Sequence, residues 1–355
     1  MKVALIGMMQ SGKSTLISAV SGRTPAPMGS PEINEVIVPV PDERLDWLTN
    51  LYKPQKAVHA TVDCLDLPGL NFLDEHGRAA ARKLFGQIRT VDLFVAVVRA
   101  FENDAVAAYR NRIQPGKDLE ELRTEFLLAD LELVTTRIER LEKQVHKPTR
   151  TAARDKEELA LHGKLQTILE SERPLSAAGL SARELDLIKP LGFLTLKPMM
   201  VVVNVGENRL NQPVDLGSAA GGAEAICLSA EIESQLAQLD PQSRKEFMQD
   251  MNLAEPASAK FVQSCYKALG LISFLTVGKD EVRAWTIESG TSAHEAAGKV
   301  HSDIQRGFIR AETMAYADLH RLGDEKAVKA AGKMRLEGKT YVVQDGDIIC
   351  FRFNV

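Results

Sequence analysis

The chain has 355 residues, which is enough for two or three domains with substantial cores, and its net charge is −4. Hydrophobic residues make up 45% and charged residues 26% of the sequence, an ordinary globular composition. The small negative charge excludes a global basic field, so any contact with RNA has to use a local patch. No apolar run approaches the ~20 residues of a membrane span, and the four cysteines are dispersed, so we expect a soluble, cytoplasmic protein.

The first motif lies at the N-terminus, between an apolar run expected to be a buried strand (3–6) and a helix that opens at 15–17. Residues 7–14, GMMQSGKS, fit the pattern G-x-x-x-x-G-K-[ST] of a phosphate-binding loop, or P-loop. Gly7 and Gly12 permit backbone angles that let successive N–H groups converge on phosphate oxygens, and the helix N-terminus adds its positive end. Lys13 is predicted to reach the β- and γ-phosphates as a catalytic residue, and the Ser14 hydroxyl to bind Mg²⁺. The residues predicted to bind the phosphates are Met8, Met9, Gln10, Ser11, Gly12, Lys13, Ser14 and Thr15.

The second motif follows the predicted strand 61–65 and reads Asp66-Leu67-Pro68-Gly69, the D-x-x-G pattern of P-loop switch proteins. Asp66 is predicted to hold Mg²⁺ through a water, and the Gly69 N–H to face the γ-phosphate during catalysis. Between the two motifs, residues 25–31 (PAPMGSP) occupy the place of a first switch. Ser30 is the candidate second Mg²⁺ ligand there, with a solvated loop serine as the alternative.

The base end of the site is predicted at residues 201–210, VVVNVGENRL, where a short hydrophobic run stops at Asn204. GTPases usually carry Asn-Lys-x-Asp at this point, whereas Val205 and Glu207 replace the Lys and the Asp here. Asn204 still suits the paired donor and acceptor on adenine, so we expect ATP rather than GTP, held by Asn204 and the Val205 backbone. After another short strand, Ser229 and Ala230 fit the Ser-Ala element that completes such a base pocket.

With these motifs in place, the whole chain from Met1 to Val355 resembles the Obg-like ATPases of the YchF type. The resemblance implies an α/β fold: a P-loop NTPase domain of the TRAFAC class, an inserted antiparallel helical hairpin, and a C-terminal β-grasp (TGS) domain. It also implies preferential binding of ATP with Mg²⁺, slow hydrolysis, and association with ribosomes or rRNA. The resemblance is densest in the P-loop and in residues 38–48, 97–105, 193–207, 281–287 and 331–355.

The helical hairpin also has a pattern of its own. Apolar residues recur three or four apart from Leu119 to Val145, residues 146–150 interrupt the pattern, and a second helical pattern includes Leu161 and Leu165. Two helices that bury each other explain this pattern, and a partner-binding tip at 147–156 is the alternative. The predicted domains are 1–115 with 191–275 (P-loop domain), 116–190 (hairpin) and 276–355 (TGS domain).

In the last part, residues 281–287 alternate as a strand and residues 293–310 are helix-like. Residues 341–349 are predicted to form a strand, an Asp-Gly turn and a second strand. Strands around one helix suit a β-grasp domain, and no catalytic constellation is apparent there. The histidines of this part are interpreted as ordinary surface or core residues.

Several positions depart from the family pattern. Gln10 stands where the family has Asn, and Gly29 removes a cysteine associated with redox regulation. Leu70 occupies the position where Ras-like enzymes place a water-orienting Gln, and the family shares this hydrophobic substitution. The family is thought to use instead a His at the position of Ala108, whose methyl group cannot orient water. Residues 77–81, GRAAA, favour a helix over a mobile loop.

Three functions are therefore weighed. The first is a weak ATPase that acts as a nucleotide-gated switch on the ribosome, through the hairpin or the TGS domain. The second is an ATP-binding adaptor that does not hydrolyse, and the third is a GTPase with a degenerate base motif. His76 is the candidate catalytic substitute for the missing histidine, against a solvated loop histidine. The oligomeric state, potassium dependence and any entry of Arg78 or Arg82 into a site in trans stay open.

Overall fold

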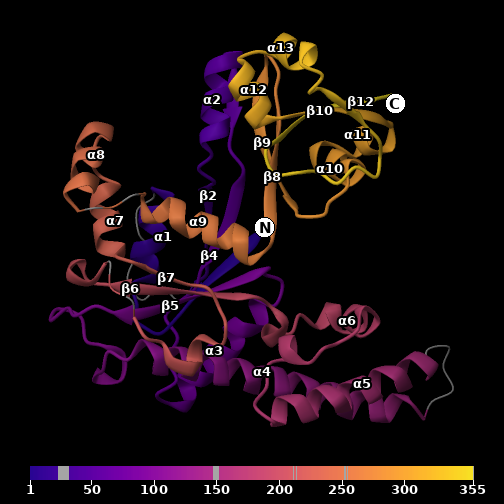
Figure 1. The fold of residues 1–355 in the computed structure, drawn as a ribbon. Helices are drawn as coiled ribbons and strands as arrows, with labels where there is room; N and C mark the ends of the chain where they lie inside the picture. The colour runs from indigo at the N-terminus through magenta and orange to yellow at the C-terminus, as the bar shows by residue number, and fades with distance from the viewer. Residues whose placement is uncertain are drawn as a thin grey trace. The chain divides into compact units, whose positions relative to one another are not determined.

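The computed structural model describes residues 1–22, 32–146, 152–210, 212, 214–251, 253 and 255–354. Ser30, the rest of the predicted first switch at 25–31, and residues 147–151 of the predicted hairpin tip lie outside the described residues. The chain forms two compact units, residues 1–36 with 63–258 and residues 37–62 with 259–355 (Figure 1). The division into three domains with the boundaries given above stays a prediction.

The first sheet, whose strands β2 and β4 cross the unit boundary and whose other strands lie in the first unit, has the strand order β2-β4-β1-β5-β6-β7. Its strands are β1 (Lys2–Ile6), β2 (Asn34–Pro39), β4 (Thr61–Asp66), β5 (Leu93–Ala100), β6 (Met199–Val205) and β7 (Ala225–Leu228). The pairs β1–β4, β1–β5, β5–β6 and β6–β7 are all parallel. Strand β5 is buried along its whole length, as expected for a parallel strand covered on both faces.

Helices supply the remainder of this unit. They are α1 (Lys13–Ser21), α3 (Glu75–Gln87), α4 (Pro115–Gln144), α5 (Ala152–Glu170), α6 (Ala182–Ile188), α7 (Ala230–Leu236) and α8 (Pro241–Asp250), while α9 (Ala257–Ala268) crosses the unit boundary. Short 3-10 turns are η1 (Tyr109–Asn111), η2 (Leu175–Ala177), η3 (Lys189–Leu191), η4 (Leu194–Leu196), η5 (Glu207–Arg209) and η6 (Gly217–Ala220). Among the described residues, no helix combines the length and the apolar character needed to cross a membrane.

The long helices α4 and α5 form the predicted helical pair. Helix α4 begins at Pro115, where a proline lacks only an N–H that would be unpaired anyway. Val134 of α4 and Leu161 and Leu165 of α5 belong to one buried cluster, so the two helices bury each other's apolar stripes. The helix expected at residues 77–81 is also present, as part of α3.

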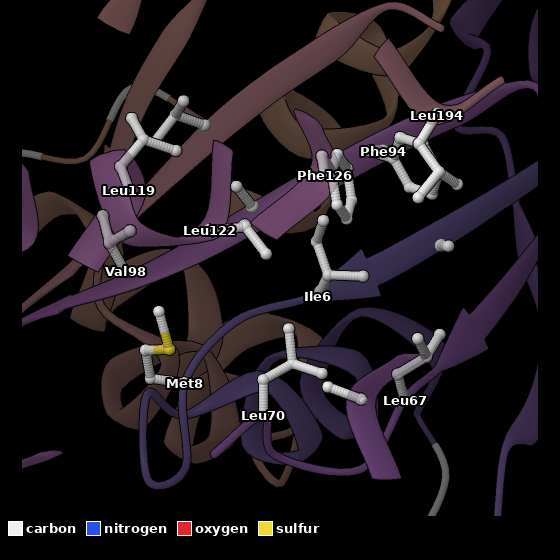
Figure 2. Packing of buried hydrophobic residues seen from close by; sticks show 14 of the residues in the cluster. Ile6, Met8, Leu67, Leu70, Phe94, Val98, Leu119, Leu122, Phe126 and Leu194 are labelled. Atoms are coloured by element: carbon white, nitrogen blue, oxygen red, sulfur yellow. The ribbon is translucent and has the colours of Figure 1, made fainter. Parts of the chain in front are cut away.

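Helix α4 packs on the sheet and on α3 through aromatic side chains. The ring of Phe126 lies 5.0 Å from that of Phe85 and 4.9 Å from that of Phe94, centroid to centroid. Figure 2 shows Phe126 of α4 beside Phe94 of β5, with Leu119 and Leu122 continuing the contact along the helix. Aromatic pairs at such distances add about 0.5–1.5 kcal/mol each to the burial of their area.

One buried carboxylate fastens α4 to the segment before β6. Asp130 is 0% exposed and accepts hydrogen bonds from the N–H groups of Leu194 (3.1 Å) and Thr195 (2.8 Å) and from the Thr195 hydroxyl (2.9 Å). Arg89 donates to the same carboxylate at 2.9 Å. Because both oxygens are hydrogen-bonded, the charge is tolerated in the interior and fixes the position of α4.

The second unit contains another sheet, with the order β11-β10-β12-β8-β9-β3. Its strands are β3 (Lys56–Val58), β8 (Leu271–Thr276), β9 (Glu281–Glu288), β10 (Phe308–Ala315), β11 (Arg335–Glu337) and β12 (Asp347–Phe353). Its helices are α2 (Glu43–Tyr52), α10 (Ala293–Val300), α11 (Ser302–Arg306), α12 (Tyr316–Leu322) and α13 (Glu325–Ala330).

Two local predictions for this unit are wrong. The helix expected at 293–310 ends at Arg306 and is divided at His301, whose φ of −164° is extended; Phe308 begins β10 and is buried. The strand expected at 341–344 is absent, although the turn and β12 after it are present. Instead, Val342 forms an isolated antiparallel bridge with Ser292, and the Tyr341 hydroxyl and the Gln344 N–H both donate to the buried carboxylate of Asp347.

Candidate nucleotide-binding site

The two predicted phosphate motifs meet at one edge of the first sheet. Strands β1 and β4 are parallel neighbours, so the loops that follow them emerge side by side, where ligands of parallel α/β sheets bind. The N–H of Met9 donates to the carbonyl of Leu70 at 3.0 Å, and the N–H of Leu70 donates to the carbonyl of Gly7 at 3.0 Å. The P-loop and the segment after Gly69 therefore form one hydrogen-bonded assembly.

The P-loop glycines are required for two different reasons. Gly12 has a φ of +89°, in the left-handed region that side chains rarely adopt. Gly7 has an ordinary φ, contrary to the prediction, and its reason is space: a Cβ there would lie 2.2 Å from the carbonyl oxygen of Val97. Gln10 adopts a φ of +61°, which is uncommon for a residue with a side chain and favours Asn or Gly.

Lys13 is the first residue of α1 and is 5% exposed. Its ammonium donates to the carbonyl oxygens of Gly7 (2.9 Å) and Met8 (3.2 Å), so its side chain lies along the loop. Burial lowers the pKa of Lys13 to about 8, and the negative charge of Asp66 acts in the opposite direction. The predicted phosphate-binding lysine is thus a buried cation held by backbone carbonyls.

The predicted magnesium ligands that are described lie together. Asp66, at the end of β4, is 3% exposed, and its Oδ1 has no hydrogen-bond partner. Burial raises the pKa of Asp66, while a hydrogen bond from Ser14 and the charge of Lys13 act to lower it. A hydroxyl next to a carboxylate with an unused oxygen is a donor set that suits Mg²⁺, a hard cation that prefers oxygen.

Asn204 connects the base segment to the P-loop. Its side chain is buried, its amide nitrogen donates to the carbonyl of Ser11 at 3.0 Å, and its amide oxygen accepts from the N–H of Ala230 at 3.0 Å. Ala230 begins α7, and the hydroxyl of Ser229 caps that helix by accepting from Ile232 N–H. One N–H of Asn204 is left over by these bonds, and its contact with a base stays a prediction.

The two residues that replace the guanine-reading pair lie in different environments. Val205 is 1% exposed and belongs to the buried cluster under α4, which leaves only its backbone for the predicted base contact. Glu207 begins η5 and is exposed. The aliphatic stem that covers the base in Asn-Lys-x-Asp proteins therefore has no counterpart at Val205.

The sequence reading missed Arg99, which organises the loop after β5. It is 5% exposed, and its guanidinium donates to the carbonyl oxygens of Phe101 (3.1 Å), Val106 (2.9 Å) and Ala107 (3.3 Å). The same group lies 4.4 Å from the centre of the Phe101 ring, a cation–π contact. An arginine inside an otherwise apolar strand was the available signal, because a buried charge needs several acceptors nearby.

Phe101 was also missed as a site residue. A Cβ on Gly12 would lie 3.8 Å from its ring, and a Cβ on Gly206 would lie 3.9 Å from its side chain. Phe101 therefore stands between the P-loop and the base segment, with an aromatic surface at their junction.

The candidate hydrolytic positions lie in different environments. Leu70 is 1% exposed in the buried cluster, so it cannot act on water. Ala108 precedes η1, and the hydroxyl of the next residue, Tyr109, accepts from the Phe72 N–H at 3.2 Å. His76 is exposed in the first turn of α3, and its catalytic role stays a prediction.

These features, a parallel sheet with a P-loop after its first strand and a D-x-x-G turn beside it, define a P-loop α/β protein. The chain is 39% identical to the ribosome-binding ATPase YchF of Haemophilus influenzae, covering 100% of this chain and 99% of that one. It is 38% identical to the ribosome-binding ATPase YchF of Bacillus subtilis (99% and 98% covered) and 36% identical to Obg-like ATPase 1 of Oryza sativa subsp. japonica (100% and 92%).

The solved structures and the family models agree with these relatives. The structure of the Schizosaccharomyces pombe YchF GTPase matches with a TM-score of 0.82 and 31% identity, covering 99% of this chain and 97% of that chain. The family model YchF-GTPase_C, described as "Protein of unknown function (DUF933)", matches residues 271–354. The chain belongs to the YchF/Obg-like ATPase family over its full length.

Proposed function

We propose that this chain is a ribosome-binding ATPase that binds Mg·ATP, hydrolyses it slowly, and changes its partner contacts with the nucleotide state. The observation that carries the proposal is the hydrogen-bonded link from Ser11 through Asn204 to Ala230, which joins a P-loop to a base segment without the guanine-reading Lys and Asp. The relatives named as ribosome-binding ATPases, 38–39% identical over nearly the whole chain, support it.

In this proposal, residues of the P-loop and of α1 bind the phosphate groups of ATP. The Lys13 ammonium, which now donates to Gly7 and Met8, would exchange these carbonyls for phosphate oxygens. The N–H groups at the start of α1 add the positive end of a helix. Ser14 and, through water, Asp66 would hold Mg²⁺, with Ser30 as the further proposed ligand. When bound, this ion neutralises charge on the phosphate oxygens.

Adenine is preferred to guanine in this proposal for a physical reason. Guanine presents N1–H and N2–H₂ donors, which a short carboxylate accepts, and Glu207 is a longer and exposed replacement. Adenine presents an N6 donor and an N7 acceptor, which an amide such as Asn204 matches. The ring of Phe101 offers a stacking surface near the same junction.

Hydrolysis is expected to be slow because the usual water-orienting groups are absent from the two positions that carry them. Leu70 is buried among apolar side chains and Ala108 has only a methyl group. Positioning and charge stabilisation by Lys13, the Gly69 N–H and Mg²⁺ still support phosphoryl transfer. The same two residues favour a second candidate, an ATP-binding adaptor that does not turn over.

A single-turnover assay with radiolabelled ATP, alone and with ribosomes, separates the two candidates. Slow cleavage that is lost in Lys13→Ala supports the ATPase, and binding without cleavage supports the adaptor.

Ribosome co-sedimentation with ATP, with ADP and without nucleotide tests the proposed binding to the ribosome. If Lys147, Arg150 and Arg154 are changed to Glu and co-sedimentation is unaltered, the contact does not use the hairpin tip and residues 276–355 become the proposed surface.

A further inference from the structure

A surface pocket of about 650 Å³ lies between α3 and α4. Its lining includes Arg78 and Arg82 of α3, Arg110 and Arg112 of the segment before α4, and Lys117 and Glu121 of α4. The volume is within the range of small-molecule sites. None of these cationic residues was needed for the nucleotide site proposed above, and they come from three separate segments of the first unit.

The charges of this pocket are arranged in two layers. Arg78 is 47% exposed in its side chain, whereas its partner Glu125, 3.3 Å away, is 8% exposed. Arg112 and Asp118, which are 2.9 Å apart, show the same order at 24% and 5%. The carboxylates lie beneath and the guanidinium groups lie outside, so a ligand that enters meets donors first.

The outer, cationic side chains still have N–H groups that are free to bind a ligand. A guanidinium group has five N–H donors, and the ion pair of Arg110 with Glu121 uses two of its nitrogens. Arg82 lies 3.9 Å from Glu132, whose side chain is 63% exposed, so this pair is weak. Lys117 is exposed and has no ion pair within the described ranges.

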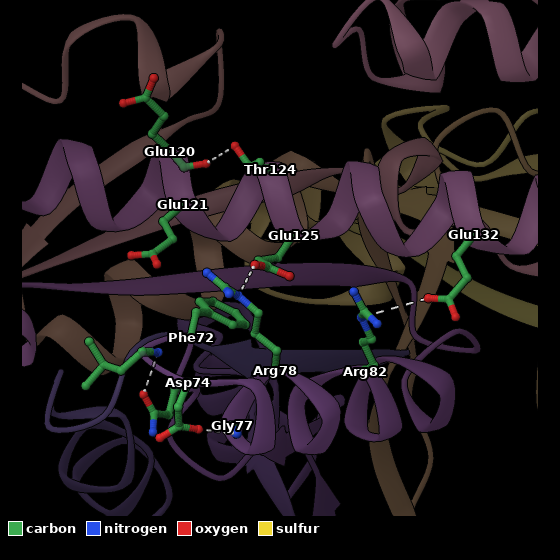
Figure 3. A network of polar contacts seen from close by, with 12 residues as sticks. Phe72, Asp74, Gly77, Arg78, Arg82, Glu120, Glu121, Thr124, Glu125 and Glu132 are labelled. Atoms are coloured by element: carbon green, nitrogen blue, oxygen red, sulfur yellow. Dashed lines mark hydrogen bonds and ion pairs between the residues drawn. The ribbon is translucent and has the colours of Figure 1, made fainter.

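The orientation of the acidic residues on α4 agrees with this arrangement. Figure 3 shows the side chains of Glu121 and Glu125 on the side of α4 that faces α3, with a dashed line from Arg78 to Glu125. The carboxylate of Glu120 points away from α3 in the same view. The carboxylate of Glu120 is therefore directed away from the arginine side chains of the pocket.

We propose that the α3–α4 pocket is an anion site that binds phosphate groups, from a free polyphosphate or nucleotide or from the backbone of RNA. Exposed guanidinium groups on both sides suit a ligand with more than one phosphate, because each planar fork can hold two oxygens. No P-loop residue lines this pocket, although Arg112 also lines the small cavity beside Gly7 and Met8. The proposal does not depend on the function proposed for the P-loop.

The pocket is connected to the switch segment through described contacts. Arg78 and Arg82 lie on α3, which begins five residues after Leu70. Arg110 adjoins Tyr109, whose hydroxyl holds the N–H of Phe72. Arg110 and Asn111 both have positive φ, at 54° and 51°, and backbone strain of this kind persists only where surrounding contacts hold it. A ligand that competes for Arg110 would act on this turn.

The test uses the full chain and a pair of charge-matched double variants. In Arg82→Gln/Lys117→Gln, neither change strips a buried carboxylate of its partner. The control, Lys83→Gln/Lys245→Gln, removes the same charge from exposed positions of α3 and α8, outside both the pocket lining and the hairpin. Binding of sodium tripolyphosphate and of a labelled 12-nucleotide single-stranded RNA is measured at several salt concentrations, and thermal melting checks folding. Any P-loop contribution is common to all three proteins and cancels in the comparison.

We expect the pocket variant to bind at least one probe about tenfold more weakly and with a smaller salt dependence, while the control matches the original chain. Loss confined to tripolyphosphate identifies a free polyphosphate as the source, and loss confined to RNA identifies a nucleic acid backbone. Equal binding of both probes by the pocket variant and the control would overturn the proposal. So would equal loss in both variants, since that reports only net charge.

Discussion

The side-chain amide of Asn204 donates to the carbonyl of Ser11 at 3.0 Å and accepts from the N–H of Ala230 at 3.0 Å. One amide thereby joins the P-loop, β6 and α7. Space is tight around it, because a Cβ on Gly12 would lie 2.1 Å from the same amide nitrogen. The phosphate and base ends of the site are therefore positioned by one another, and a change at Asn204 is expected to affect both.

The first prediction concerns this bridge. Asn204→Ala leaves a buried carbonyl and a buried N–H without partners, at a cost of about 2–4 kcal/mol in the free energy of unfolding, and weakens ATP binding. Urea unfolding and nucleotide titration measure the two effects. Asn208→Ala, an exposed asparagine in η5, is the control and should change neither quantity. A stable Asn204→Ala protein with unaltered ATP affinity would remove the bridging role.

The second prediction places a histidine at position 108, where the family resemblance predicts one. Ala108→His should raise the single-turnover rate of ATP cleavage by about 10²–10⁴-fold, because an imidazole can accept or orient a water proton. Ala107→His places the same ring at the adjacent exposed position and should leave the rate unchanged. If both variants or neither variant accelerates cleavage, Ala108 is not the position that limits hydrolysis.

The third prediction concerns the attachment of α4. Asp130→Ala removes four hydrogen-bond or ion-pair contacts and leaves Arg89 with carbonyl acceptors only, so we expect about 3–5 kcal/mol of destabilisation. Glu139→Ala, at an exposed position of the same helix, should cost less than about 0.5 kcal/mol. Chemical denaturation followed by circular dichroism compares the two variants. A loss for Asp130→Ala as small as that of the control would contradict this account.

The fourth prediction follows from the buried lysine. Burial lowers the pKa of Lys13 to about 8 in the nucleotide-free protein, and nearby phosphate charge is expected to raise it. Above pH 8 the bound form then holds more protons than the free form, so ATP binding takes up protons and weakens as pH rises. Calorimetry at pH 7 and pH 9 in buffers of different ionisation enthalpy measures the uptake. No uptake at pH 9 would show that ATP does not change the protonation of Lys13 and would contradict this prediction.

Local patterns were enough to predict the elements that carry the phosphate motifs. The strand, glycine loop and helix around Lys13 are all present, and so are α3 and the pair of long helices, because each is specified by contiguous residues. The contacts of Arg99 and Tyr109 could not be predicted this way. Their partners are set by tertiary packing, such as that between Tyr109 and Phe72, which are 37 residues apart.

The errors in the second unit have a related cause. Residues 301–310 carry an apolar spacing that a helix and a strand share, and the pairing of Phe308 with Phe353 of β12 decided between them. In residues 341–344, β-branched residues favour a strand locally, but the backbone there is bonded to residues 291–293: Val343 N–H donates to the Thr291 carbonyl at 3.0 Å, and Ala293 N–H donates to the Tyr341 carbonyl at 2.7 Å.

The measurement that tests the central claim most directly is a calorimetric comparison of ATP and GTP binding to the full chain in the presence of magnesium. With Val205 and Glu207 in place of the guanine-reading residues, we predict that ATP binds at least tenfold more tightly. GTP binding that equals or exceeds that of ATP would contradict the account.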